Sequence, residues 1–245
     1  AGYIAFPKED SHVPVELIIG NVAEIIEMGY EIESLSGEVA RIYEEISMIW
    51  KLTSRLGATL NVNEICNILA DEVMTICPSR NVSVMLLGEM PSGSSAPACI
   101  RKGSAPLETI KPLFFPKATL GVDANRASTM AFSSDRGLLG HVYSAKEPIT
   151  VCDVSKDERF EGFPYSVTRI LVVPLVAEGS VIGLIVANDK TNGEEYFTTE
   201  IKLVHSIASE CATSIKKALL YEEVNSMLFS TAESFSLAMD AKDPY

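Results

Sequence analysis

The chain has 245 residues, and its 47% hydrophobic content is enough for a packed core, which excludes a mainly disordered protein. Its 33 acidic and 20 basic residues give a formal net charge of -13, which argues against nucleic acid or an anionic membrane surface as a partner. The five cysteines are scattered without a CxxC pair, and every apolar stretch is interrupted within a bilayer's length, so we expect a cytoplasmic protein.

The first heptad pattern lies near the N-terminus. We predict an N-terminal segment with a short amphipathic helix over residues 1–30, followed by a coiled-coil-like linker helix over 31–57. A single helix lying on its own domain is the alternative, but the narrow seam over four heptads favours pairing with a second chain. The predicted seam residues of this helix are Ile32, Leu35, Val39, Ile42, Ile46, Ile49 and Leu56.

Helix and strand signals then alternate. A helix is predicted from Asn61, which is suited to capping, to about Ile76, and strands are predicted at 82–87 and 98–101, paired across a loop rich in serine. Residues 104–135 are irregular, and we expect them to form a long covering segment. A short helix at 137–143 and a strand at 148–153 follow.

The clearest hairpin joins residues 170–176 to 181–188 through Glu178 and Gly179. Its strands are almost continuously Val, Ile and Leu, which predicts central strands buried on both faces.

A second heptad pattern begins at Thr198 and continues to about Asp240. Asn225 at a seam position would fix the register of a helix pair, although it is equally typical of an exposed residue in a frayed helix. The predicted seam residues here are Ala218, Tyr221, Asn225, Leu228 and Phe235.

The run from Gly137 to Phe160, the following hairpin and the long last helix together resemble a GAF domain over about residues 53–222. The resemblance implies an α+β fold, an α/β sandwich with an antiparallel sheet of about six strands and helices on one face. Long N- and C-terminal dimerisation helices would flank a GAF-like domain at 58–222. A structural lock between sheet and last helix is implied for Asn188, Lys190, Phe197 and Glu200, although Asp189 interrupts the family's Asn-Lys pair.

The same resemblance implies a ligand pocket on the other face of the sheet, for a cyclic nucleotide or another metabolite. Structural roles compete: Asp153 would cap a turn, Phe160 would fill the core, and Lys190 with Glu200 would form only a salt bridge. The candidate ligand-binding residues are Arg101, Leu138, Thr150, Asp153, Phe160 and Arg169.

Residues 238–245 resemble the opening of HD-GYP-type cyclic diguanylate phosphodiesterase domains, so 223–245 are predicted as a signalling helix leading to an absent HD-type output domain. Metal ions would belong to that output domain. We expect no cofactor, metal site or catalytic residue within the sequence itself, because its three histidines lie in unrelated segments.

The predicted function is a homodimeric sensory module that relays a small-molecule or conformational signal to the phosphodiesterase. One alternative is a structural dimerisation domain without a ligand. Another is a GAF-type reductase of free methionine sulfoxide that uses Cys99 and Cys152, which lie on predicted strands.

Overall fold

The computed structural model describes residues 24, 26–40, 42–43, 46–47, 59–88, 112–121, 131–160 and 166–242. The chain divides into two compact units, residues 1–50 and 51–245. Among the described residues, no helix is both long enough and apolar enough to cross a membrane.

The first unit is helical wherever it is described, and residues 26–40 form helix without interruption. The predicted boundary between residues 30 and 31 is therefore not a break in secondary structure. The seam side chains in this unit are all exposed, by 45% to 62%: Ile32, Leu35, Val39, Ile42 and Ile46. Ile49 and Leu56 lie outside the described residues.

The second unit is built on one six-stranded antiparallel sheet with the strand order β3-β2-β1-β6-β5-β4. This is the α+β architecture that the sequence predicts. Its elements are α2 (Val62–Ile76), β1 (Ser79–Gly88), β2 (Leu113–Leu120), β3 (Phe132–Ser133), α4 (Gly137–Ala145), β4 (Ile149–Val151), the 3-10 helix η2 (Val154–Lys156), β5 (Ile170–Ala177), β6 (Ser180–Lys190) and α5 (Thr198–Lys242).

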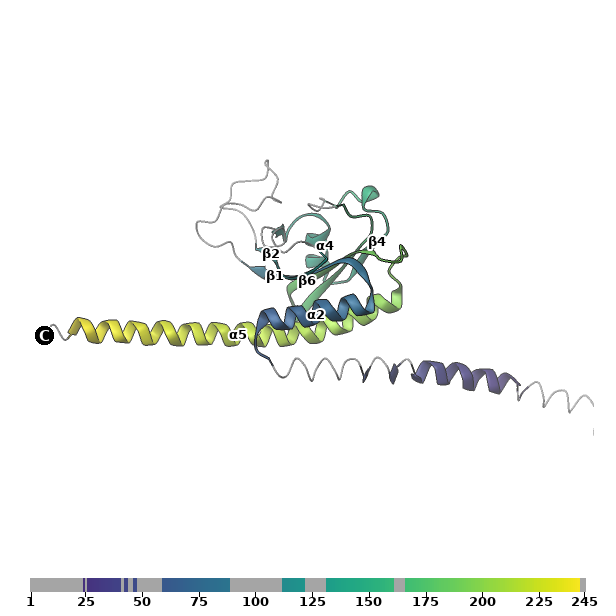
Figure 1. The fold of residues 1–245 in the computed structure, drawn as a ribbon, viewed down its shortest axis with the longest axis horizontal. Helices are drawn as coiled ribbons and strands as arrows, with labels where there is room; N and C mark the ends of the chain where they lie inside the picture. Colours follow the sequence, from purple (N-terminus) through teal and green to yellow (C-terminus); the bar gives the residue numbers. More distant parts are fainter. Residues whose placement is uncertain are drawn as a thin grey trace, which may run out of the picture. The chain divides into compact units, whose positions relative to one another are not determined.

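Helices cover both faces of the sheet, whereas the resemblance implied helices on one face. In Figure 1, α2 lies beside the first part of α5 on one side of the sheet, and α4 lies on the other side. The prediction for α2 is confirmed, because the side-chain oxygen of Asn61 accepts hydrogen bonds from the backbone N–H groups of Asn63 and Glu64 at 2.9 and 3.2 Å.

The predicted hairpin is confirmed as β5 and β6, and both strands are almost entirely buried. Glu178 and Gly179 both have positive φ, 51° and 76°, as a tight two-residue turn between twisted strands requires. The sequence pattern therefore identified the centre of the sheet correctly.

The expectation that residues 104–135 form only an irregular cover is wrong, because Leu113–Leu120 form β2 and pair with β1. The predicted pairing of 82–87 with 98–101 is wrong as well, because β2 and β6 occupy the two edges of β1; residues 98–101 themselves lie outside the described residues. Pro116 sits within β2, and the register between β1 and β2 shifts between Val84 and Met85. A bulge is where a sheet tolerates proline, which cannot donate a ladder hydrogen bond. Because proline is rare inside strands, the sequence pattern around Pro116 does not indicate a strand.

Helix α5 is a continuous element of 45 residues. Its first part is core: Val204, Ile207, Cys211, Ile215 and Ala218 are all fully buried. Ala218 therefore belongs to the domain interior, and the exposed part of the predicted seam starts at Tyr221, which is 51% exposed.

Gly183→Ala is expected to destabilise the domain by about 3 kcal/mol, because a core already packed against backbone cannot absorb the added methyl group. A Cβ at Gly183 would lie 2.3 Å from the carbonyl oxygen of Met85 on the neighbouring strand. Urea unfolding of this variant and of Gly37→Ala, which meets nothing within 4 Å, tests the expectation. Equal midpoints for the two variants would contradict it.

Candidate functional site

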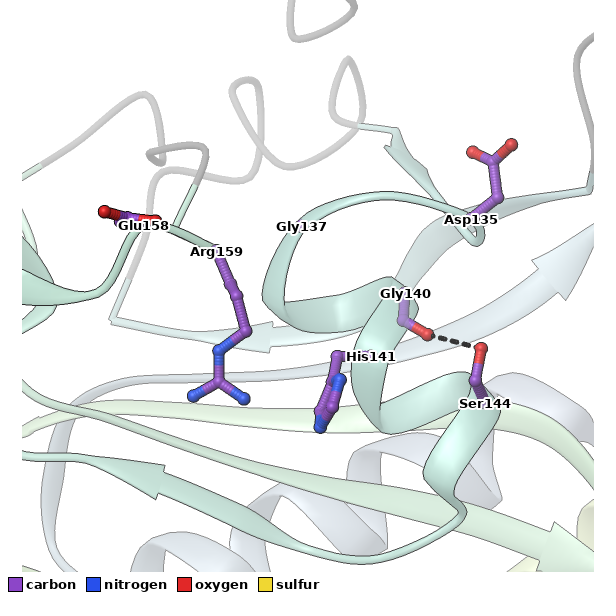
Figure 2. Close-up of a pocket in the computed structure, with 7 residues that line it drawn as sticks. All are labelled: Asp135, Gly137, Gly140, His141, Ser144, Glu158 and Arg159. Atoms are coloured by element: carbon purple, nitrogen blue, oxygen red, sulfur yellow. Dashed lines mark hydrogen bonds between the residues drawn. The ribbon is translucent and has the colours of Figure 1, made fainter.

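The candidate site is an open hollow of about 330 Å³ beside α4. Most of the groups at its rim are exposed and polar, and Figure 2 shows the imidazole of His141 and the guanidinium of Arg159 pointing toward the same side. Its lining residues are Asp135, Gly137, Gly140, His141, Ser144, Glu158 and Arg159. Such a set offers both donors and acceptors to a small polar molecule.

One wall of the hollow is a tight turn held by Asp157. The carboxylate accepts hydrogen bonds from the backbone N–H of Arg159 at 2.9 Å and from its Nε and Nη2 at 3.0 and 2.7 Å. These bonds lower the pKa of Asp157, and the neighbouring His141 lowers it further. The guanidinium is therefore oriented by its own turn rather than by a distant element.

The space between α4 and the sheet is filled with apolar side chains rather than left for a ligand. Leu138 and Val142 of α4 pack on buried residues of the central strands, and Phe114 meets the ring of Tyr143 edge-on at 5.8 Å. The hollow therefore lies on the polar side of α4, away from this cluster.

None of the five candidate ligand residues that the structure describes lines the hollow. Leu138 is buried in the core, and Phe160 packs partly buried against it. Thr150 is exposed on the edge strand β4. Asp153 caps η2 by accepting from the backbone N–H of Ser155 at 3.1 Å, and Arg169 donates through Nη1 to the carbonyl of Gly193 at 2.7 Å, while Arg101 lies outside the described residues.

Four residues of the hollow carried no prediction of their own: Arg159, which directly precedes Phe160, and Asp135, Ser144 and Glu158. The usable signal is the Asp157-Glu158-Arg159 triplet, because an acidic residue two positions before an arginine can close a charged turn. His141, on α4, is exposed at the hollow.

The residues of the proposed lock meet at the junction of β6 and α5. Nζ of Lys190 lies 2.8 and 3.1 Å from the two carboxylate oxygens of Glu200 and 4.7 Å from the ring centroid of Phe197. One of those oxygens also accepts from the backbone N–H of Phe197 at 2.8 Å, which fixes the first turn of α5. Asn188 is buried beside them at the end of β6.

Two buried hydroxyl groups, those of Ser79 and Tyr196, lie next to the residues of the lock in the sheet and in the chain. The hydroxyl groups of Ser79 and Tyr196 lie 3.1 Å apart, and the hydroxyl of Ser79 also donates to the carbonyl of Cys77. Burial raises the pKa of Tyr196, so its hydroxyl keeps its proton.

The pKa values of the described cysteines are all raised above the ordinary thiol value. Burial raises the pKa of Cys66, Cys77 and Cys211 to about 12 each. Desolvation and the Glu195 carboxylate also raise the pKa of the exposed Cys152. Cys99 lies outside the described residues, and the described part of the chain holds no group of three or more His, Cys, Asp or Glu side chains suited to a metal ion.

Because these thiols are buried, we expect the free energy of unfolding of the domain to decrease at alkaline pH. In the folded chain burial raises the pKa of these thiols from 9.0 to about 12, whereas in the unfolded chain they ionise near pH 9. The free energy of unfolding is therefore unaffected by them below pH 9 and decreases as the pH rises from 9 toward 12. Thermal unfolding between pH 7 and 10.5 should show a falling midpoint, and Cys66→Ala with Cys211→Ala should flatten that fall. A parallel decline in this double variant would contradict the assignment to the thiols.

Comparison with known proteins identifies the family to which this fold belongs. Residues 61–215 match the GAF domain family. A dual 3',5'-cyclic-AMP and -GMP phosphodiesterase 11 of Drosophila melanogaster is 28% identical over 178 residues, which is 66% of this chain but only 12% of that protein.

Solved structures agree with the fold. The GAF domain of an Acinetobacter phosphoenolpyruvate-protein phosphotransferase aligns with a TM-score of 0.57 at 16% identity, covering 72% of this chain and 95% of that one. A GAF domain/HD domain protein from Geobacter sulfurreducens aligns with a TM-score of 0.52 at 16% identity, covering 67% and 98%. With a family match over more than half of its length and this sheet order, the chain belongs to the GAF domain family.

Proposed function

We propose that the chain is a regulatory, non-catalytic GAF module that dimerises and relays a small-molecule or conformational signal to a downstream HD-GYP-type phosphodiesterase. The observation that carries the proposal is the continuity of α5. Its first part is an integral piece of the domain core, and the same helix continues through residue 242, beyond the buried stretch. A shift of the core against the sheet would therefore move the distal helix as one body.

The identity of the downstream domain is inferred from three resemblances. Residues 238–245 resemble the start of HD-GYP-type domains, the Drosophila melanogaster relative is a cyclic nucleotide phosphodiesterase, and the Geobacter sulfurreducens structure is described as a GAF domain/HD domain protein. All three support a phosphohydrolase as the controlled partner, with its metal ions held by that output domain.

Dimerisation is supported by the distal part of α5. Large apolar side chains there are exposed by 44% to 77%, which is unfavourable unless another surface covers them: Leu220, Tyr221, Val224, Met227, Leu228, Phe229, Phe235 and Leu237. Leu228 and Phe235 recur with heptad spacing, and Asn225 is half-buried at a seam position. A second copy of the same helix presents the complementary seam.

The relay is tested by insertions after Glu222, in the protein that carries the chain with its output domain. Seven inserted residues preserve the heptad phase of α5, whereas two rotate the distal helix by roughly 200°. We expect cyclic diguanylate hydrolysis to stay within about twofold of the parent for seven residues and to change at least tenfold for two. Equal activities in both variants, with both dimeric by light scattering, would refute relay through α5.

The apolar filling between α4 and the sheet favours a second candidate, a structural dimerisation domain that binds no ligand. Thermal unfolding across a panel of cyclic nucleotides and small metabolites separates the two functions, since a ligand of the folded state raises the midpoint. A reductase is less favoured by the raised thiol pKa values. It predicts methionine sulfoxide turnover that is lost in Cys99→Ser and Cys152→Ser.

A further inference from the structure

Asp189, which interrupts the expected Asn-Lys pair, fastens the end of β6 to the start of β5. Its backbone has a φ of 50°, a conformation that aspartate tolerates better than most residues. Its carboxylate oxygen Oδ1 accepts from the backbone N–H groups of Thr168 and Arg169 at 3.0 and 2.8 Å, and its own N–H donates to the carbonyl of Arg169 at 3.0 Å. We call Asp189 and Arg169 the clasp.

The clasp is bonded on one side to the wall of the hollow. The carbonyl of Thr168 accepts from the N–H of Val154 at 2.9 Å, and the carbonyl of Val154 accepts from the N–H of Asp157 at 3.3 Å. Asp157 in turn holds Arg159, which lines the hollow. Two backbone hydrogen bonds therefore connect this wall to Thr168.

On the other side the clasp reaches the segment that precedes α5. Nη1 of Arg169 donates to the carbonyl of Gly193 at 2.7 Å, and the N–H of Gly193 donates to the backbone carbonyl of Lys190 at 2.9 Å. Lys190 also binds the carbonyl of Glu195 at 3.3 Å and the carboxylate of Glu200 in the first turn of α5. Nε of Arg169 is buried without a hydrogen-bond partner among the described residues.

We propose that the clasp couples the Asp157–Arg159 wall of the hollow to the first turn of α5, so that a change at the wall alters the order of residues 191–201. The coupling rests on the proposed function, for which it supplies the route from the domain surface to the signalling helix. Such coupling would appear as non-additive effects of substitutions in the wall and in the clasp.

Amide hydrogen exchange of the full 245-residue chain, without ligand, measures this coupling. Arg169→Met removes the bond to Gly193, and Asp189→Gly keeps the positive φ but removes the acceptor. Each should speed exchange across residues 191–201 about tenfold and leave α2 unchanged. Arg136→Met is the matched control, because Arg136 is an exposed arginine whose nearest carboxylate contact is 4.0 Å long.

Asp157→Asn then perturbs the wall. In the parent it should speed exchange at residues 191–201 severalfold, and in the Arg169→Met background it should add nothing. Asp189→Gly serves as the second background if Arg169→Met does not fold. No effect of Asp157→Asn in the parent, or an equal effect in both backgrounds, overturns the proposal. Because exchange is read without an output domain, such a result leaves the phosphodiesterase relay to be judged by its own assay.

Discussion

Glu200→Gln is expected to destabilise the domain by about 3 kcal/mol, because it leaves the ammonium of Lys190 buried without its counter-charge. The Lys190 side chain is only 3% exposed, while that of Glu200 is 19% exposed. The variant also weakens the acceptor for the backbone N–H of Phe197 at the start of α5. Urea unfolding, followed by circular dichroism, should show a lower midpoint with an unchanged slope.

The matched double variant separates the charge effect from packing. Lys190→Met combined with Glu200→Gln removes both charges and should be more stable than Glu200→Gln alone, since no uncompensated ammonium remains. Lys156→Met breaks an ion pair of similar length, 2.9 Å to Asp153, but at a lysine that is 82% exposed, so it should leave the unfolding midpoint almost unchanged. Equal losses in Lys156→Met and Glu200→Gln would show that burial of the pair is unimportant.

The centre of the sheet was predictable because its residues carry a strong local signal. β5 and β6 are nearly continuous β-branched and aliphatic residues on either side of Glu178-Gly179, a combination that favours a buried hairpin. β2 was not predictable by the same argument, because Pro116 contradicts a strand until its bulge is known. Pairing with β1 outweighs this local preference.

The site was less predictable than the fold, because function there depends on which way each side chain faces. Leu138 and His141 are three residues apart on one helix, yet the first lies in the core and the second on the hollow. Asp189 looked like a departure from a family motif, and only its backbone conformation shows that its carboxylate binds the start of β5. The sequence gives the position of Asp189 but neither its backbone conformation nor the direction of its side chain.

Leu228→Glu is expected to convert the chain from a dimer to a monomer at micromolar concentration. Leu228 is 63% exposed in the single chain and occupies a predicted seam position, where a buried glutamate pair would combine desolvation with like-charge repulsion. Light scattering should move from about twice the 26.6 kDa chain mass to a single chain mass, a loss of at least 100-fold in dimer affinity.

The neighbouring residue offers a matched control for that result. Phe229 is 77% exposed on the same helix but lies one residue, about 100° around the axis, from the seam. Phe229→Glu removes an even more exposed apolar side chain and adds the same charge away from the seam, so it should leave the dimer intact. If both substitutions dissociate the dimer equally, the contact does not follow the heptad seam. If neither does, α5 does not hold the two copies together, and the relay would need a different second surface.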